Sequence, residues 1–355
     1  MRILKSALRY LAAWPYYHSK RFLSHLKGKV LILTYHRVLS REYTEKNFVQ
    51  AGMYVYTDIF EMHMLFVKKY FKIVSFNELI EIWHKGTWDN GMRYCLVTFD
   101  DGWLDNYLHA FPILKRNAIP ATIFLPTSFI GTDEWFWPEK MAYLFTVVCR
   151  EGAIKATQYH REFLSPHFPW LRELSEFGHG YIDSIIEKSK YVDRAEVDRL
   201  ISTLGQNLTL TIPSERLILN WSEILEMSKE QVSFGSHSMT HPILTSLSAS
   251  TVRHEAEGSL VAIMRSGANV TPVFCYPNGN WSNEIVDVLK SLPYKAAVTT
   301  MSGLEEAAPK NRFALSRVGI HNGNSANLPL FVWHISGMNQ ILSKKNETGA
   351  HISTY

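Results

Sequence analysis

The chain has 355 residues, which is enough for one large α/β domain or two modest ones. Its composition, 46% hydrophobic and 20% charged, is that of a globular protein, and a net charge of +4 is too small to indicate nucleic-acid binding. Two of the three cysteines, Cys95 and Cys275, fall in stretches that predict buried strands. We therefore expect reduced packing residues rather than a disulfide framework.

Residues 1–29 form a basic and aromatic segment. They contain no apolar run long enough for a membrane span, and the apolar core of a secretory signal is absent. We favour a helix that caps the fold. The alternative is a helix that lies on a membrane surface. Four apolar side chains would then share one face: Leu4, Leu8, Leu11 and Trp14. We expect a cytoplasmic protein. A helix that lies on the membrane would place it at the inner membrane face.

Short apolar runs rich in β-branched residues alternate with amphipathic stretches over residues 30–325. This alternation predicts a parallel sheet, and about eight strands predict a closed barrel. We expect a deformed (β/α) barrel with about seven to eight parallel strands. The expected strands are Val30–Tyr35, Lys72–Ser75, Tyr94–Phe99, Ala121–Leu125, Gln231–Gly235, Val273–Tyr276, Lys295–Thr299 and Leu315–Ile320. The expected helices are Phe60–Lys69, Asn77–His84, Trp103–Lys115, Val252–Arg265 and Asn283–Ser291.

Residues from about 135 to 220 interrupt this alternation. Their patterns predict helices, so we expect a helical insertion between the fourth and fifth strands. Because it follows the carboxyl end of a strand, it would overhang the site there and shape substrate choice. Residues 326–355 are expected to form a C-terminal helix and a frayed tail. The helices expected in the insertion are Lys140–Arg150, Asp183–Lys190 and Arg194–Leu204.

Polar and reactive residues follow several of the expected strands at their carboxyl ends. In a (β/α) barrel these ends meet at one rim, where barrel enzymes build their active sites. Residues scattered through a core would not sort in this way. The sequence therefore predicts an active site at this rim. The residues concerned are His36, Asp100, Asp101, His237, Tyr276 and His321.

Asp101, His237 and His241 are candidate ligands for a metal ion with room left for water. The spacing of the two histidines places both rings on one helical face or in one tight turn. Neutral imidazole suits zinc, iron, cobalt and nickel. We expect a divalent metal, zinc in the first place, with cobalt, nickel or iron as alternatives. The competing interpretation is a surface histidine pair at the start of a helix.

Asp100 is the candidate base for the water. Neighbouring residues on a strand point to opposite faces, so both carboxylates reach one pocket only if the chain turns there. Gly102 permits such a turn. Asp101 would then bind the metal while Asp100 accepts the proton. The competing interpretation is an Asx turn or a cap for the helix that follows.

Four further positions are candidates for supporting roles. His36 or His321 could protonate a leaving amine, since the pKa of histidine lies near neutrality. Arg317 could pair with Asp100 and keep it ionised, or lie on the surface. Residues 274–279 predict a rigid turn that brings a backbone amide to the pocket, where it could stabilise an oxyanion. An ordinary Pro-Asn-Gly turn and a structural histidine are the simpler interpretations.

Together these segments resemble the polysaccharide deacetylases, the NodB-homology family that is also called carbohydrate esterase family four. The family's Thr-Phe-Asp-Asp-Gly motif is present unaltered at residues 98–102. Its His-Ser/Thr-x-x-His motif is at residues 237–241, and the Tyr-Pro-x-Gly form of its third motif is at residues 276–279. The resemblance covers roughly residues 30–320, apart from the expected insertion.

The resemblance implies a metal-dependent hydrolase that removes N-acetyl groups from a sugar in a poly- or oligosaccharide, in cell-surface or exopolysaccharide biosynthesis. It also implies that the backbone N–H of Tyr276 stabilises the oxyanion. Many members carry an arginine in the third motif that orients the catalytic aspartate. Residues 274–275 are Phe-Cys here, so Arg317 is the candidate substitute.

The resemblance also bears on the general acid. A late Leu-x-His motif supplies the acid in many members, and residues 320–321 match it only loosely. One branch of the family uses a histidine in an early Tyr-His segment, which residues 35–36 match. We therefore favour His36 over His321 as the acid.

The expected partner is an N-acetylated carbohydrate, with no nucleic acid and with peripheral membrane association through the basic N-terminus as an open alternative. The same site could hydrolyse an O-acetyl ester or a non-sugar amide. The chain could also be a carbohydrate-binding homologue without catalysis, which the intact aspartates and histidines argue against. An iron oxygenase with two histidines and one carboxylate leaves Asp100 unexplained.

Overall fold

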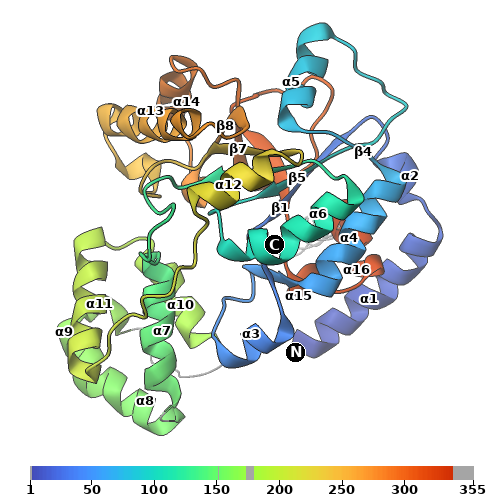
Figure 1. The fold of residues 1–355 in the computed structure, drawn as a ribbon. Helices are drawn as coiled ribbons and strands as arrows, with labels where there is room; N and C mark the ends of the chain where they lie inside the picture. Colours follow the sequence, from blue (N-terminus) through green and yellow to red (C-terminus); the bar gives the residue numbers. More distant parts are fainter. Residues whose placement is uncertain (1, 151, 173–179, 339–355) are drawn as a thin grey trace, which may run out of the picture. The chain divides into compact units, whose positions relative to one another are not determined.

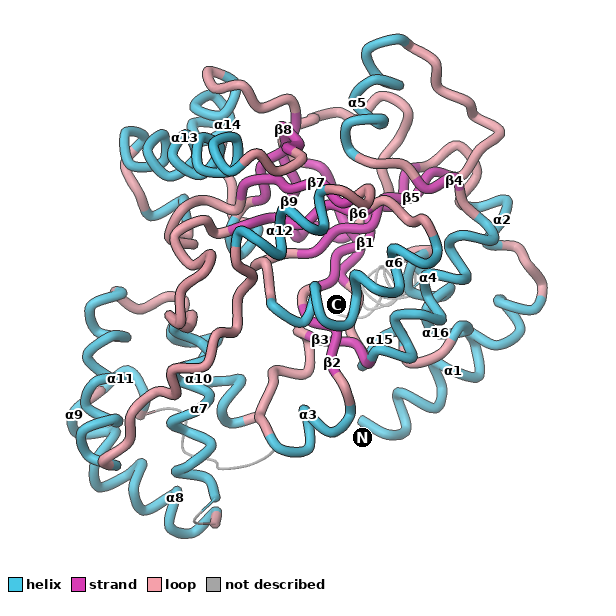
Figure 2. Tube along the Cα trace, in the orientation of Figure 1, coloured by secondary structure: helices cyan, strands magenta, loops and turns pink. Residues whose placement is uncertain are grey.

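Seven parallel strands form the expected closed barrel (Figures 1 and 2). A computed structural model describes residues 2–150, 152–172 and 180–338, without the side chains of residues 2–8 and 153–155. The barrel strands are β1 (Val30–Tyr35), β5 (Tyr94–Phe99), β6 (Ala121–Leu125), β7 (Val232–Ser236), β8 (Val270–Cys275), β9 (Ala296–Ser302) and β10 (Leu315–Gly319). Their order is β1, β10, β9, β8, β7, β6, β5, and a pairing between β1 and β5 closes the ring. The prediction of a deformed (β/α) barrel is confirmed.

The strands follow from uninterrupted apolar runs. Every residue of β1, β5 and β6 is buried, as expected for a parallel strand between a barrel interior and a layer of helices. These three strands begin and end where the sequence predicts. The others differ by a few residues at one or both ends; β8, for example, begins at Val270 rather than at Val273.

Three short strands lie outside the barrel. β4 (Lys72–Ile73) was expected as a full strand, but it only extends the sheet beside the first residues of β5. β2 (Arg37–Leu39) and β3 (Tyr54–Tyr56) pair with each other and were not predicted. Three residues are too few to show the alternation of apolar and polar side chains by which a strand is recognised.

Helices surround the barrel (Figure 1). α12 and α13 pack on β7, and α4 packs on α6. One expected helix, Trp103–Lys115, is instead a π-helix (Asn106–Ala110) followed by α6. Pro112 lacks an N–H and cannot continue the α-helical ladder, and the N–H of Phe111 donates to the Asn106 carbonyl five residues earlier. These helices are α4 (Thr57–Tyr70), α5 (Phe76–Lys85), α6 (Phe111–Asn117), α12 (Trp221–Ser228), α13 (Ala249–Ser266) and α14 (Asn283–Lys290).

The residues expected to form an insertion belong to a second compact unit, which comprises residues 41–50 and 133–217. This unit has its own hydrophobic core, with Phe145, Ile185 and Leu200 fully buried. That it overhangs the site remains a prediction. Its helices include α3 (Arg41–Lys46), α7 (Trp137–Arg150), α8 (Ala153–Tyr159), α9 (Ser165–His167), α10 (Tyr181–Ser189) and α11 (Arg194–Leu208).

The N-terminal segment is helical and packs on the C-terminal helix. α1 (Arg2–His18) lies against α16 (Leu328–Ile335), and Tyr16 meets Trp333 edge to face with ring centres 5.7 Å apart. α2 (Phe22–His25) and α15 (Asn322–Ser325) are single turns. Among the described helices, none combines the length and the apolarity that crossing a bilayer requires. The expected tail, residues 339–355, lies outside the described residues.

Candidate active site

Asp100 and Asp101 directly follow β5, and the chain turns sharply at this point. Asp101 has a φ of 71° and Gly102 a φ of 64°, so both adopt the left-handed conformation. A side chain at Gly102 would put a Cβ 2.9 Å from Leu125, which explains the glycine. A left-handed aspartate is strained by about 1 kcal/mol or more, and strain of this kind is concentrated at functional sites. The turn directs both carboxylates to one place.

His237 and His241 lie in a tight turn after β7, not on a helix. Ser238 and His241 are both left-handed, with φ of 67° and 58°. The Ser238 hydroxyl accepts a hydrogen bond from the backbone N–H of His241 at 3.0 Å. Of the two arrangements that the histidine spacing permitted, the structure therefore contains the turn.

The three expected metal ligands meet at one point. Asp101 Oδ1 lies 3.4 Å from His237 Nε2 and 3.3 Å from His241 Nε2, and the two Nε2 atoms are 3.2 Å apart. A metal about 2.1 Å from each ligand with tetrahedral angles would separate them by about 3.4 Å. The residues therefore fit a divalent cation. His241 is about a quarter exposed, whereas Asp101 and His237 are buried.

Hydrogen bonds to neighbouring groups orient two of these ligands. His237 Nδ1 donates to the Cys275 carbonyl at 2.8 Å, which leaves the lone pair of Nε2 free for a metal. The Trp103 indole N–H donates to Asp101 Oδ2 at 3.1 Å. Burial alone would raise the pKa of Asp101, but its hydrogen bonds to His237 and His241 outweigh burial and lower the pKa well below the ordinary value. Asp101 is thus ionised near neutral pH.

Asp100 is paired with a buried arginine. Arg317 Nη1 donates to Asp100 Oδ1 at 2.8 Å and Nη2 donates to Oδ2 at 2.7 Å, with both side chains almost fully buried. Arg317 Nε donates to the Thr299 carbonyl at 2.8 Å, which fixes the guanidinium plane. Burial would raise the pKa of Asp100, and the charge of Arg317 outweighs it and lowers the pKa. The surface alternative for Arg317 is wrong.

The two acid candidates have different surroundings. His36 Nε2 lies 4.0 Å from Asp100 Oδ2, and its side chain is about a quarter exposed. His321 Nδ1 is buried and has no hydrogen-bond partner among the described residues. Burial is the main reason that the pKa of His321 is lowered to about 4, with nearby positive charges contributing. His321 is therefore neutral near pH 7 and poorly suited to donate a proton.

A family comparison supports the chemistry of this site. The model of the family described as polysaccharide deacetylase matches residues 89–158 and 190–297, half of the chain. The chain belongs to the polysaccharide deacetylase family. Both candidate metal-binding motifs fall within the matched residues.

Solved deacetylases share the fold of this family member. The Streptococcus pyogenes deacetylase PplD, in complex with acetate, is 20% identical with a TM-score of 0.54 over 86% of this chain and 98% of that one. IcaB from Ammonifex degensii is 16% identical with a TM-score of 0.53 over 87% and 97%. YxkH of Bacillus subtilis is 46% identical over only 46 residues, which cover 13% of this chain and 16% of that relative. The structural likenesses establish the fold, and the YxkH match is too short to transfer an activity.

One expected role in this deacetylase fold is not supported. The backbone N–H of Tyr276 donates to the Val298 carbonyl at 3.2 Å, as part of the ladder between β8 and β9. The Tyr276 hydroxyl donates to the Phe313 carbonyl at 2.8 Å. Neither donor is free to stabilise an oxyanion in this conformation. The turn at residues 277–279 forms as expected, but it does not release the amide of Tyr276.

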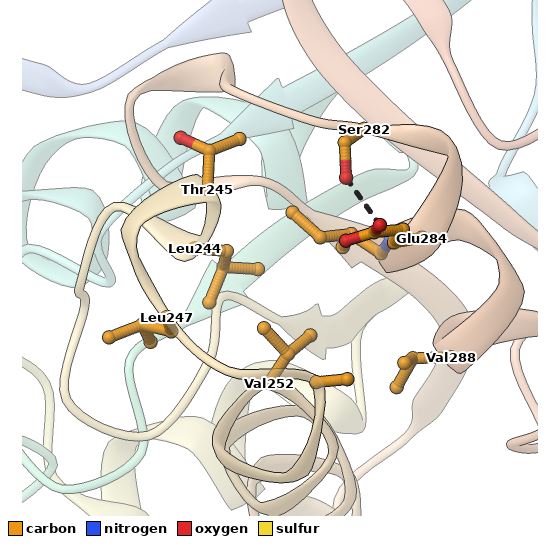
Figure 3. Close-up of a pocket in the computed structure, with 9 residues that line it drawn as sticks. Leu244, Thr245, Leu247, Val252, Ser282, Glu284 and Val288 are labelled. Carbon is orange, nitrogen blue, oxygen red and sulfur yellow. Dashed lines mark hydrogen bonds between the residues drawn. The ribbon is translucent and has the colours of Figure 1, made fainter.

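A small hollow follows the histidine turn in the chain (Figure 3). It has a volume of about 40 Å³ and lies between α13, α14 and residues 244–247. Leu244, Val252 and Val288 line it, and the Ser282 hydroxyl beside it accepts a hydrogen bond from the Ile285 N–H at the start of α14. Its volume is too small for a sugar ring, so it is a packing space rather than a sugar site.

The sequence did not reveal that Glu255 holds the histidine turn. This buried glutamate of α13 accepts hydrogen bonds from the N–H groups of Met239 and Thr240 at 2.7 and 2.9 Å. It also accepts one from the Thr240 hydroxyl at 2.7 Å. One helical turn later, a Cβ on Gly258 would lie 2.2 Å from the Met239 sulfur. The one available signal was a glutamate on the face of α13 that also carries the buried Val252.

Replacing Glu255 with alanine is expected to weaken zinc binding about 10–100-fold, because the turn between the two histidines loses its anchor. Glu255→Gln should retain most of the affinity. The amide oxygen can accept from both backbone N–H groups, and the amide nitrogen can donate to Thr240. Competition with a chromophoric chelator measures the affinities. Ser259→Ala, on the same buried face of α13, is the control. Equal affinity in Glu255→Ala and wild type would contradict this role.

Proposed function

We propose that this protein is a metal-dependent hydrolase that removes N-acetyl groups from a sugar in a poly- or oligosaccharide, with a free amine and acetate as products. The single observation that carries the proposal is the convergence of Asp101, His237 and His241 to within 3.4 Å of one another. An ionised Asp100 directly precedes Asp101 in the chain. Membership of the polysaccharide deacetylase family supports the substrate class.

Asp101, His237 and His241 would hold the cation, with zinc first and cobalt, nickel or iron as alternatives. A bound divalent cation would supply Lewis acidity, which makes water more acidic and a carbonyl more electrophilic. The low pKa of Asp100 keeps this carboxylate able to accept the proton of the attacking water. Arg317 holds both oxygens of Asp100 in a fixed plane.

His36 is the proposed acid for the departing amine. It lies beside Asp100, its side chain is partly exposed to the solvent from which substrate enters, and its backbone carbonyl accepts a hydrogen bond from Asn106 Nδ2 at 2.8 Å. The Arg37 guanidinium, next in the chain, donates to Asp105 at 2.8 Å. These bonds hold the chain on the carboxyl side of His36. We propose that this deacetylation is a step in cell-surface or exopolysaccharide biosynthesis.

Acetate release from a panel of N-acetylated oligosaccharides tests the proposal. The wild-type protein is expected to release acetate, to lose this activity after dialysis against a chelator, and to regain it when zinc is added back. Acetate and free amine should form in equal amounts. Activity that survives complete removal of metal would contradict the proposal, as would release of a product other than acetate from every substrate.

Substitution of His36 by alanine is expected to lower kcat/KM for an N-acetyl sugar by about 10²–10⁴-fold. Hydrolysis of an O-acetyl ester should fall less, because an alcohol is a better leaving group than an amine. His321→Ala is the matched control and should change either rate much less. A large loss in His321→Ala with normal turnover in His36→Ala would transfer the acid role to His321.

A further inference from the structure

One face of α1 exposes large apolar side chains. Ala13 is fully buried where the helix packs on α16, but Leu11 is 68% exposed, Trp14 is 50% exposed and Tyr10 is 40% exposed. Their spacing places the three on one side of the helix, away from Ala13. The side chains of Leu4 and Leu8, expected on the same face, lie outside the described residues. Tryptophan and tyrosine are the residues that prefer the boundary between lipid and water.

The chain segment that contains α1 is basic. Residues 1–41 contain no aspartate or glutamate. Arg9, Lys20, Arg21 and Lys27 are all exposed. Nearby cations of this kind attract an anionic surface, and aromatic side chains among them are typical of helices that lie in a membrane interface. The chemistry of α1 therefore matches anionic lipid.

An apolar hollow continues the surface from α1 to α4. It has a volume of about 440 Å³ and is lined by Tyr17, by the half-exposed Leu65 and by Leu328. Two acidic residues, Asp58 and Glu61, lie at its edge, and Glu61 is paired with Arg116 at 2.5 Å. Figure 1 shows α1 running alongside α4 and α16. The exposed apolar surface thus extends beyond a single helix.

α1 also lies close to the catalytic rim. α1 packs on α16, and His334 of α16 has its Nε2 2.9 Å from the Gly319 carbonyl at the carboxyl end of β10. His321 follows the carboxyl end of β10, at the same rim as Asp100 and His36. His334 Nε2 also lies 3.0 Å from Asn324 Nδ2, three residues after His321 in the chain. A surface bound by α1 would therefore lie near the site.

We propose that the exposed face of α1, formed by Tyr10, Leu11 and Trp14 with the surrounding cations, docks on an anionic lipid bilayer and holds the catalytic rim at the bilayer surface. The docking stands independently of the enzyme's chemistry. The purpose that we assign to docking, which is deacetylation of a sugar carried by or emerging from the membrane, rests on the proposed function.

Sedimentation of the full chain with vesicles tests the docking. The vesicles contain phosphatidylcholine alone or with about one third phosphatidylglycerol. The protein is expected to sediment with the anionic vesicles and to be released by high salt. Lys20→Gln with Arg21→Gln should weaken binding about fivefold per charge. Leu11→Ser with Trp14→Ser should weaken it at least about tenfold. Met264→Ser, at an exposed methionine of α13, should leave binding unchanged.

Three outcomes would overturn the docking. The first is wild-type protein that stays in solution with both kinds of vesicle. The second is a Met264→Ser variant that loses as much vesicle binding as Leu11→Ser with Trp14→Ser. The third is a dimer, detected by light scattering, that Leu11→Ser with Trp14→Ser dissociates. Acetate release from soluble oligosaccharides should be normal in the α1 variants. Vesicle binding without acetate release from any substrate would refute the proposed function and leave the docking intact.

Discussion

Replacing Asp101 with asparagine is expected to lower both metal affinity and the rate of acetate release steeply, whereas replacing Asp100 with asparagine should lower only the rate of acetate release. Asp101 Oδ1 lies within 3.4 Å of both histidine Nε2 atoms, so its loss removes one of three ligands. Zinc affinity should fall by more than about 100-fold. Asp100→Asn retains all three ligands but lacks the base, so kcat/KM should fall by about 10²–10⁴-fold.

Metal content after dialysis, measured by atomic emission, and acetate release together separate the two variants. His237→Ala is the matched control for Asp101→Asn, because it removes a second ligand from the same cluster. Asp100→Asn with normal metal content and normal turnover would refute its role as base. Asp101→Asn that binds zinc as tightly as the wild type would show that the cation lies elsewhere.

Replacing Arg317 with leucine is expected to lower the free energy of unfolding by about 3–5 kcal/mol, because it leaves the Asp100 carboxylate buried without a counter-charge. The guanidinium is 1% exposed and contacts both carboxylate oxygens. Activity should fall as well, since the unpaired carboxylate takes up a proton or turns away. Urea unfolding measures the loss of stability, and Arg265→Leu, at an exposed arginine of α13, should cost less than about 0.5 kcal/mol.

The double variant, Arg317→Leu with Asp100→Asn, separates stability from catalysis. Removing the charge should restore much of the stability that Arg317→Leu loses, because the two residues interact directly. Acetate release should remain absent. If the double variant is as unstable as Arg317→Leu, the loss comes from the packing of the guanidinium and not from the unpaired carboxylate.

Residues of the site that lie in short motifs were predictable, and those that act through other elements were not. Asp100, Asp101 and the two histidines stand directly after apolar strands, where a local pattern reveals them. Glu255 lies on a helix whose pattern shows only that the position is buried. The unavailability of the Tyr276 amide depends on the pairing of β8 with β9, which the motif at residues 276–279 does not encode.

By itself, the sequence determined the barrel strands, the barrel class and the candidate metal-binding residues, because each of these follows from apolar runs and neighbouring residues. Only the tertiary structure decided that Arg317 pairs with Asp100, which lies 217 residues away along the chain. It also decided that a turn, rather than a helix, presents His237 and His241. The physical reason is that a buried charge needs a partner, and the closed barrel brings β10 within reach of the end of β5 although β1 lies between them.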